Sequence, residues 1–553
     1  MPPGAPVPWS YFLIRTLFRI VLKIFYGTIV VEGVENIPPT GHPCIVCANH
    51  TNSLTDALIL VTAIPSWRRN MLHLTAKSTQ FGKKTLTSWL IEAAGTVPIQ
   101  RRKDFVEGTA NNDAAMEKMT ETLEIGDAVC LFPEGGSRYH PTIAPLKTGV
   151  ARIVSTILSR NRNNVDFEIS ILTCSITYMH RQHFRSDVLV SFHPPLTFRP
   201  KDNPELLEPM NYDSIRFVTA QMHQQIATGT FDAPSWGHIR AAKMATPIYA
   251  PLGTAMSLGD YVRVTRTFLE VFKAGRLSSP HTSSAGSASP EVGVEWKDEN
   301  VVKLKEDLEV SSYVTINQMF LDDHPRQVYQ SELHKVRIRD DRVRRPLSRP
   351  VIMYRMVLRF IWVSFLLSIS LGGLALWLPV AATTFYAVHN FKKSGPVWDT
   401  WDEIAQYKLI YGLVSGLCVY AIAVFLTFPI FPVTVVAVPG LMWMSLRWFE
   451  DAVSAARAFV ALWRLLRVNP ATLARLRSTR ADLHRRLMPL AVRGLGLPAN
   501  PEEYFVYGGK DKGRVIGWWA SRAEYFSVRR RRKRDWNETL RLYEQFDYPP
   551  EDS

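Results

Sequence analysis

Two long stretches without any charge constrain this chain more than any other feature. Residues 360–388 and 409–446 contain no Asp, Glu, Lys or Arg. A helix needs about 20 apolar residues to cross the hydrocarbon core of a bilayer, so each stretch is long enough. The sequence therefore predicts a transmembrane region over residues 351–446. A buried hairpin in a soluble protein is the weaker alternative, because it would need two such lengths without any charge.

The second stretch is longer than one crossing needs. Pro429, Pro432 and Pro439 interrupt it. One span followed by a buried, kinked segment fits this pattern, and so does a tight hairpin. We therefore expect about two spans in all.

Charges next to the apolar stretches predict the orientation. Both outer flanks are rich in Lys and Arg, whereas the connector between the stretches balances three basic against three acidic residues: Lys392, Lys393 and Lys408 against Asp399, Asp402 and Glu403. By the positive-inside rule, both flanks are cytosolic and the connector is lumenal. The basic tail, residues 447–553, is then cytosolic.

The first half of the chain predicts an α/β domain. Six short β-branched runs are separated by longer helix-compatible segments, which is typical of a mostly buried central sheet flanked by helices; the runs are TIVVEG, CIVCAN, TVPIQ, DAVCLF, FEISILTCSIT and DVLVSF. We place this domain at residues 28–235. A helical extension follows at 236–350, interrupted by a small, polar, Ser-rich linker at 278–291.

The N-terminal segment, residues 1–27, contains an amphipathic helix. Arg15, Arg19 and Lys23 are spaced four residues apart among apolar residues, so they form one basic stripe. Such a helix suits the membrane interface, with its cations toward phosphate headgroups. Packing on the domain core is the equally weighted alternative.

The net charge of +15, from 65 Lys and Arg against 50 Asp and Glu, favours anionic partners. The uncharged stretches make membrane lipids the expected partner rather than nucleic acid. A basic run at 529–534, RRRRKR, fits a solvated segment, an anionic-lipid contact or a nuclear address. Cys44 and Cys47 form the one close cysteine pair, and they lie in a β-like run. Without zinc spacing elsewhere, buried thiols are the expected state.

The stretch NHTNSLTD places His50 after an apolar run and Asp56 a few residues later. Ser53 and Asp56 fit the S-x-x-D capping box, so these residues alone indicate only the start of a helix. Three later stretches accompany it: GTVPIQR at 95–101, FPEGGSR at 132–138 and SILTCSITY at 170–178.

In order and spacing, these four stretches resemble the four blocks of the glycerolipid acyltransferase family, whose members acylate glycerol-3-phosphate and lysophosphatidate. The stretch at 177–196, TYMHRQHFRSDVLVSFHPPL, and the C-terminal spans resemble the fungal branch that acts on glycerol-3-phosphate and dihydroxyacetone phosphate. The resemblance implies an α/β acyltransferase domain followed by C-terminal transmembrane helices and a basic helical tail.

The resemblance also implies roles for seven residues. His50 would be the general base and Asp56 its partner, as in a triad whose nucleophile is the substrate hydroxyl. The acceptor phosphate pocket would be built by Arg101, Glu134, Gly135, Ser137 and Arg138. Acyl-CoA would be the co-substrate, with no metal and no cofactor.

One departure bears on the dyad. The family spaces its histidine and aspartate as H-x4-D, whereas this chain has H-x5-D between His50 and Asp56. On an unbroken helix, residues five apart lie ~140° apart around the axis, against ~40° for four. The geometry therefore requires His50 in a loop before the helix, with Asp56 in its first turn.

The expected function is acyl-CoA-dependent acylation of the sn-1 hydroxyl of glycerol-3-phosphate, and of dihydroxyacetone phosphate, giving lysophosphatidate. The expected location is the endoplasmic reticulum membrane, multi-pass, with the catalytic domain cytosolic. Two alternatives stay open: a 1-acylglycerol-3-phosphate acyltransferase, and a non-catalytic lipid-binding scaffold with a degenerate site, which the longer His–Asp spacing favours.

Overall fold

The computed structural model describes most of the chain: residues 7–100, 112–251, 256–274, 298–308, 329–338, 340–344, 347–395 and 401–507. Arg101, the linker at 278–291 and the basic run at 529–534 lie outside these ranges. The described residues divide into two compact units. One contains those between 7 and 230 together with 384–413, and the other contains those between 231 and 383 together with 414–507.

A seven-stranded sheet is the centre of the first unit. Its strands follow the order β1-β8-β7-β2-β6-β3, with β9 paired to β7. Neighbours are parallel except where β7 meets β8 and β9. The strands are β1 (Thr28–Glu32), β2 (Cys44–Ala48), β3 (Leu72–His73), β6 (Ala128–Leu131), β7 (Ile169–Tyr178), β8 (Asp187–Phe192) and β9 (Leu196–Phe198). A separate parallel pair joins β4 (Thr75–Lys77) to β5 (Val97–Ile99). All six predicted runs form strands, and the α/β prediction is confirmed.

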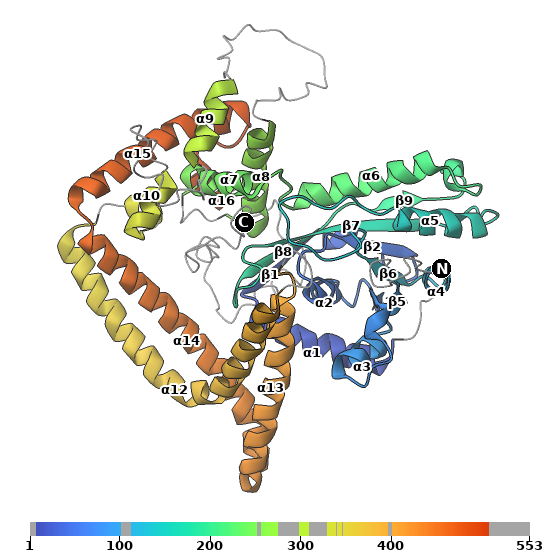
Figure 1. Cartoon of the computed structure of the whole chain (residues 1–553), viewed down its shortest axis with the longest axis horizontal. Coiled ribbons are helices and arrows are strands. Elements are labelled where there is room, and N and C mark those ends of the chain that lie inside the picture. The colour runs from blue at the N-terminus through green and yellow to red at the C-terminus, as the bar shows by residue number, and fades with distance from the viewer. Residues whose placement is uncertain are drawn as a thin grey trace. The chain divides into compact units, whose positions relative to one another are not determined.

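Helices cover both faces of this sheet (Figure 1). On one face, α1 (Trp9–Phe25), α2 (Leu54–Ala63) and the first turns of α13 (Ile404–Leu426) share an apolar core with Cys44 and Val46 of β2. On the other, α4 (Asp113–Glu124), α5 (Gly149–Arg160) and α6 (Tyr212–Gly229) pack on Ile45 and Cys47. Since successive strand residues face opposite ways, β2 is buried on both sides. Cys44 and Cys47 are buried free thiols, as predicted.

Helix α1 packs on the domain core. Tyr11, Phe18 and Leu22 are buried in the cluster that it shares with the sheet. The Arg15 side chain donates to the Ile64 carbonyl, so the basic stripe does not lie wholly in solvent. Trp9 and Phe12 remain exposed on the other side of the helix. Of the two alternatives, core packing is observed, and the interface location stays a prediction.

The uncharged stretches form three helices long and apolar enough to cross a bilayer, where about two spans were expected. They are α12 (Arg349–Ser394), α13 (Ile404–Leu426) and α14 (Phe431–Arg467). Pro429 lies in a single 3-10 turn, and Pro432 lies in the first turn of α14. A proline is tolerated in a first turn because the N–H that it lacks has no helical acceptor there. The two prolines therefore end one helix and begin another instead of kinking a single one.

The remaining described helices belong mainly to the second unit. They are α7 (Trp236–Tyr249), α8 (Leu258–Ala274), α9 (Asp298–Leu308), α10 (Tyr329–Val336), α11 (Asp340–Arg344), α15 (Pro470–Pro489) and α16 (Pro501–Tyr507), while α3 (Leu86–Ala93) lies in the first unit. The carboxylate of Asp340 accepts hydrogen bonds from Tyr329 at 2.6 Å and Arg480 at 2.7 Å. This buried cluster links α10, α11 and α15.

Candidate active site

Three adjacent strands bring the candidate residues to one edge of the sheet. Strands β7, β2 and β6 are parallel neighbours, so their carboxyl ends lie together. His50 follows β2, Phe132 follows β6, and Tyr178 is the last residue of β7. This edge is where open α/β sheets place their ligand sites.

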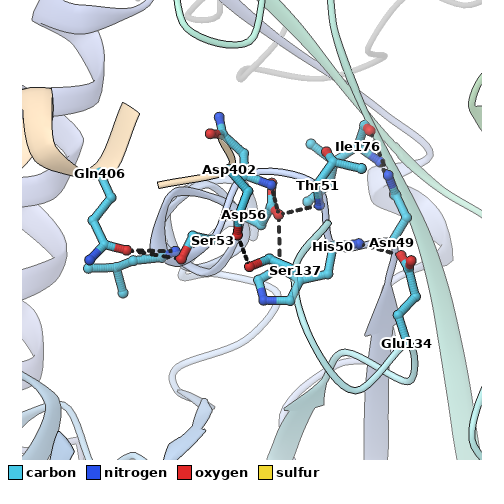
Figure 2. Close-up of polar contacts among 12 residues, drawn as sticks. Asn49, His50, Thr51, Ser53, Asp56, Glu134, Ser137, Ile176, Asp402 and Gln406 are labelled. Atoms are coloured by element: carbon cyan, nitrogen blue, oxygen red, sulfur yellow. Dashed lines mark hydrogen bonds and ion pairs between the residues drawn. The ribbon is translucent and has the colours of Figure 1, made fainter. Parts of the chain in front are cut away.

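His50 and Asp56 form a hydrogen-bonded pair, with Nδ1 of His50 2.9 Å from Oδ2 of Asp56 (Figure 2). His50 lies in the loop before α2, and Asp56 is the third residue of that helix. The loop absorbs the extra residue of the H-x5-D spacing, so the predicted geometry is confirmed.

The predicted capping box is wrong in its first half. Ser53 occupies the N-cap position of α2, but its side chain accepts no bond from the helix backbone. The second half is replaced by a tighter arrangement, because Oδ2 of Asp56 accepts the backbone N–H groups of Thr51 at 2.9 Å and Asn52 at 2.8 Å. Asp56 therefore orders the loop that carries His50 as well as binding its ring.

Tyr178 is a site residue to which the sequence analysis assigned no role. Its hydroxyl donates to Oδ1 of Asp56. Burial, and then the charge of Asp56, raise the pKa of Tyr178 well above its ordinary value, so the phenol stays protonated and remains a donor. Asp56 is fully buried, and a buried carboxylate needs such donors to offset its lost hydration. The position of Tyr178 at the end of a strand is the signal that could have indicated it.

The His50 ring presents its second nitrogen away from Asp56. The ring stacks on Phe132, with centroids 4.1 Å apart and planes inclined by 17°. When Nδ1 donates to Asp56, the neutral ring keeps a lone pair on Nε2. The side chain is 16% exposed, and no protein group in the described ranges bonds to Nε2. A substrate hydroxyl reaching Nε2 would therefore meet a general base.

The FPEGGSR loop is tied to the backbone of His50. Oε1 of Glu134 accepts the His50 N–H at 2.7 Å, and the Arg138 N–H donates to the His50 carbonyl at 3.0 Å. Oε2 of Glu134 accepts the N–H of Ala144 at 3.2 Å. Burial raises the pKa of Glu134, and the two N–H donors oppose that shift. Glu134 therefore positions the loop against the dyad.

Two features of this loop suit an anion. Gly135 has a φ of 76°, a left-handed backbone conformation that favours glycine, and the side-chain amino group of Lys147 lies close against it. Lys147 is an exposed cation that the sequence analysis missed. Nε of Arg138 is buried with no hydrogen-bond partner among the described residues. A buried donor of this kind calls for a ligand or a water.

Two further residues hold the loop between β2 and α2. The side-chain amide of Asn49 pairs with the backbone of Ile176, donating at 3.0 Å and accepting at 2.7 Å. Nη1 of Arg181 donates to the Thr51 carbonyl at 2.9 Å. Strand β7 and the segment after it thus support the histidine loop from the side.

The connector between the apolar stretches also reaches this site (Figure 2). The Ser137 hydroxyl donates to Asp402, and the Ser53 hydroxyl donates to Oε1 of Gln406 at 3.0 Å. These residues belong to one compact unit. Groups in hydrogen-bond contact cannot lie on opposite sides of a ~30 Å hydrocarbon core, so the expectation of a connector on the opposite side of the membrane is wrong. The positive-inside rule considers only the charges of a loop, so it cannot predict that the loop packs against a folded domain.

The site lies within a recognisable acyltransferase domain. Residues 28–177 match the family model described as Acyltransferase, and residues 322–493 match that described as Glycerol-3-phosphate acyltransferase 2 C-terminal domain. His50, Asp56 and the FPEGGSR loop all fall in the first match. The resemblance to the glycerolipid acyltransferases is therefore confirmed, for the α/β domain and for the C-terminal region.

Individual relatives are distant. The chain is 22% identical over 364 residues to Glycerol-3-phosphate O-acyltransferase 2 of Saccharomyces cerevisiae, covering 47% of this chain and 48% of that protein. It is 24% identical over 369 residues to an uncharacterized acyltransferase of Schizosaccharomyces pombe, covering 62% and 48%. The crystal structure of the 1-acyl-sn-glycerophosphate acyltransferase PlsC from Thermotoga maritima matches 39% of this chain and 78% of its own, at 20% identity and a TM-score of 0.28. The chain spans about half the length of the curated relatives that it matches.

Proposed function

We propose that this protein transfers an acyl group from acyl-CoA to the sn-1 hydroxyl of glycerol-3-phosphate, and also acylates dihydroxyacetone phosphate. The observation that carries the proposal is the His50–Asp56 pair held against the FPEGGSR loop, whose Arg138 has a buried, unpartnered Nε. A base beside an anion-binding loop fits a phosphorylated alcohol. The name of the Saccharomyces cerevisiae relative supports the same acceptor.

The geometry supports a direct transfer. Nε2 of His50 takes the proton from the acceptor hydroxyl as the oxygen attacks the thioester carbonyl. Asp56 holds the ring in the required tautomer and stabilises the imidazolium. When the tetrahedral intermediate collapses, the C–S bond breaks, and the CoA thiolate takes the proton from His50. The guanidinium of Arg138 would hold the acceptor phosphate, for which its planar fork is suited. Arg101 is proposed for the same role from the resemblance alone.

Removing the Arg138 side chain tests the acceptor site. Glycerol-3-phosphate has no chain to bury, so phosphate contacts must supply most of its binding. We expect Arg138→Ala to raise the acceptor KM by roughly 10- to 150-fold, equivalent to ~1.5–3 kcal/mol for a charge-assisted hydrogen bond. The acyl-CoA KM should change little. Arg138→Lys should restore part of the loss, because it keeps the charge but not the fork.

The matched control for this experiment is Arg152→Ala, an exposed arginine on α5, which should leave both KM values within twofold. Glycerol-3-phosphate, dihydroxyacetone phosphate and lysophosphatidate are compared as acceptors with the wild type. Acylation of lysophosphatidate alone would replace this proposal with a 1-acylglycerol-3-phosphate acyltransferase. No CoA release with any acceptor would favour the non-catalytic scaffold.

We also propose a multi-pass location in the endoplasmic reticulum membrane, with the catalytic domain, the connector and the tail all cytosolic. The basic outer flanks support this orientation, as do the contacts of Asp402 and Gln406 with the catalytic domain. Helices α13 and α14 would then supply two crossings. Helix α12 would begin and end on the cytosolic side, so it would not cross as a simple span.

A glycosylation acceptor inserted after Gly395 tests this topology. We expect it to stay unmodified in intact cells, because the connector lies on the side of the catalytic domain. Protease added to sealed microsomes should digest the tail after residue 467. As a control, the same acceptor sequence on a lumenal reporter should be glycosylated. Modification at the Gly395 site would contradict the arrangement.

A further inference from the structure

We propose that residues 401–408, called here the connector segment, complete the active site, and that Asp402 and Gln406 are positioning residues for its two loops. The inference rests on the proposed function and adds to it. None of the four sequence blocks includes these residues. Residues 401–403 directly precede the apolar helix α13 and residues 404–408 form its first turns, far along the chain from the acyltransferase domain.

Asp402 acts on the acceptor side of the site. Asp402 is 3% exposed, and its carboxylate accepts a hydrogen bond from the Ser137 hydroxyl. Burying a carboxylate is costly unless it is hydrogen-bonded, so this contact fixes both partners. Ser137 directly precedes Arg138, whose N–H binds the His50 carbonyl. By holding Ser137, Asp402 fixes the direction in which the next residue projects its guanidinium.

Gln406 acts on the dyad side. Its Oε1 accepts the Ser53 hydroxyl at 3.0 Å and the Leu54 N–H at 3.4 Å (Figure 2). Ser53 has a φ of 47° and a ψ of −135°, a backbone conformation that residues other than glycine rarely adopt. Gln406 therefore holds a strained residue and accepts the N–H of Leu54, the first residue of α2. Asp56 projects from the first turn of this helix.

The connector segment is packed firmly enough to do this. Ala405 and Leu409 are buried in the same core as α1 and α2. Nζ of Lys408 donates to the Gln182 carbonyl. Tyr407 stacks on Phe391 with centroids 4.5 Å apart. These contacts hold the connector segment in place against the catalytic unit. A segment from the C-terminal half of the chain therefore contributes directly to the site.

A double-mutant cycle between Asp402→Ala and Ser137→Ala, in the full-length protein in membranes, tests the acceptor-side contact. Each single change should raise the acceptor KM by about tenfold, as for one charge-assisted hydrogen bond, with little effect on the acyl-CoA KM. Because both changes break the same contact, the acceptor KM of the double variant should be no higher than that of the more impaired single variant. Asp402→Asn keeps an acceptor oxygen and should retain part of the function.

Gln406→Ala tests the dyad side and should lower kcat several-fold while both KM values stay nearly unchanged. Glu121→Gln, which removes an exposed charge of the same sign on α4, is the control and should stay within twofold of wild type. The inference would be overturned if the KM increases of the two single variants multiplied in the double variant. It would also be overturned if the activity of Asp402→Ala stayed within twofold of wild type or rose above it. The same cycle is also followed by melting temperature, which does not depend on catalysis. If the wild type proved inactive, the proposed function would fail. The contact between Asp402 and Ser137 would still be tested, because non-additive changes in melting temperature would support it and additive changes would contradict it.

Discussion

Replacing His50 with Ala is expected to abolish acyl transfer while leaving the protein folded and membrane-bound. Nε2 of the His50 ring is the atom of the dyad that a substrate hydroxyl can reach. Loss of a general base costs ~10²–10⁴-fold in rate. The side chain is 16% exposed and its backbone contacts with Glu134 and Arg138 do not need the ring. The fold should therefore survive the change.

The measurement is CoA release with saturating acyl-CoA and each acceptor, alongside a melting curve of the purified protein. His42→Ala is the matched control, because His42 precedes β2 and His50 follows it. The two histidines therefore lie toward opposite ends of the same strand. The control should stay within twofold of wild type. Activity of the His50 variant within tenfold of wild type would end the dyad hypothesis.

Changing Asp56 to Asn is expected to be nearly as severe, by ~10²–10⁴-fold in kcat. The amide oxygen can still accept the N–H groups of Thr51 and Asn52, so the start of α2 should keep its shape. What disappears is the negative charge that stabilises the imidazolium and selects the Nδ1–H tautomer. The variant thus separates the structural role of Asp56 from the catalytic one.

Tyr178→Phe provides the comparison for that variant. It removes the hydroxyl that donates to Asp56 but leaves the charge, so we expect a loss of about tenfold or less, the value of a hydrogen bond of ~1 kcal/mol. Steady-state kcat and the melting temperature are measured for both variants. If Asp56→Asn and Tyr178→Phe lost activity equally, the charge of Asp56 would have no special role. If Asp56→Asn kept activity within tenfold, Asp56 would only order the loop.

Local patterns in the sequence determined much of this protein. The β-branched runs predicted six strands, because a strand buried on both faces needs apolar residues at successive positions. The H-x5-D spacing required a loop ahead of a helix, since five helical residues would turn Asp56 away from His50. FPEGGSR, at the end of a predicted strand, indicated a turn by its composition, whereas its role in the acceptor pocket came from the resemblance to the family. Each of these inferences depends on residues close together in the chain.

Only the tertiary structure decided which distant residues complete the site. Ser137 and Asp402 are 265 positions apart, and Tyr178 meets Asp56 across 122 positions. In the sequence, Asp402 was one acidic residue in a charge-balanced connector, and a single chain holds no signal for such a pairing. The same contact overturned the expected side of the connector, because charge bias predicts how a loop crosses a membrane but not where it docks. Composition and periodicity report the local environment of a residue, whereas its long-range partners follow from how the sheet edge and the connector segment pack together.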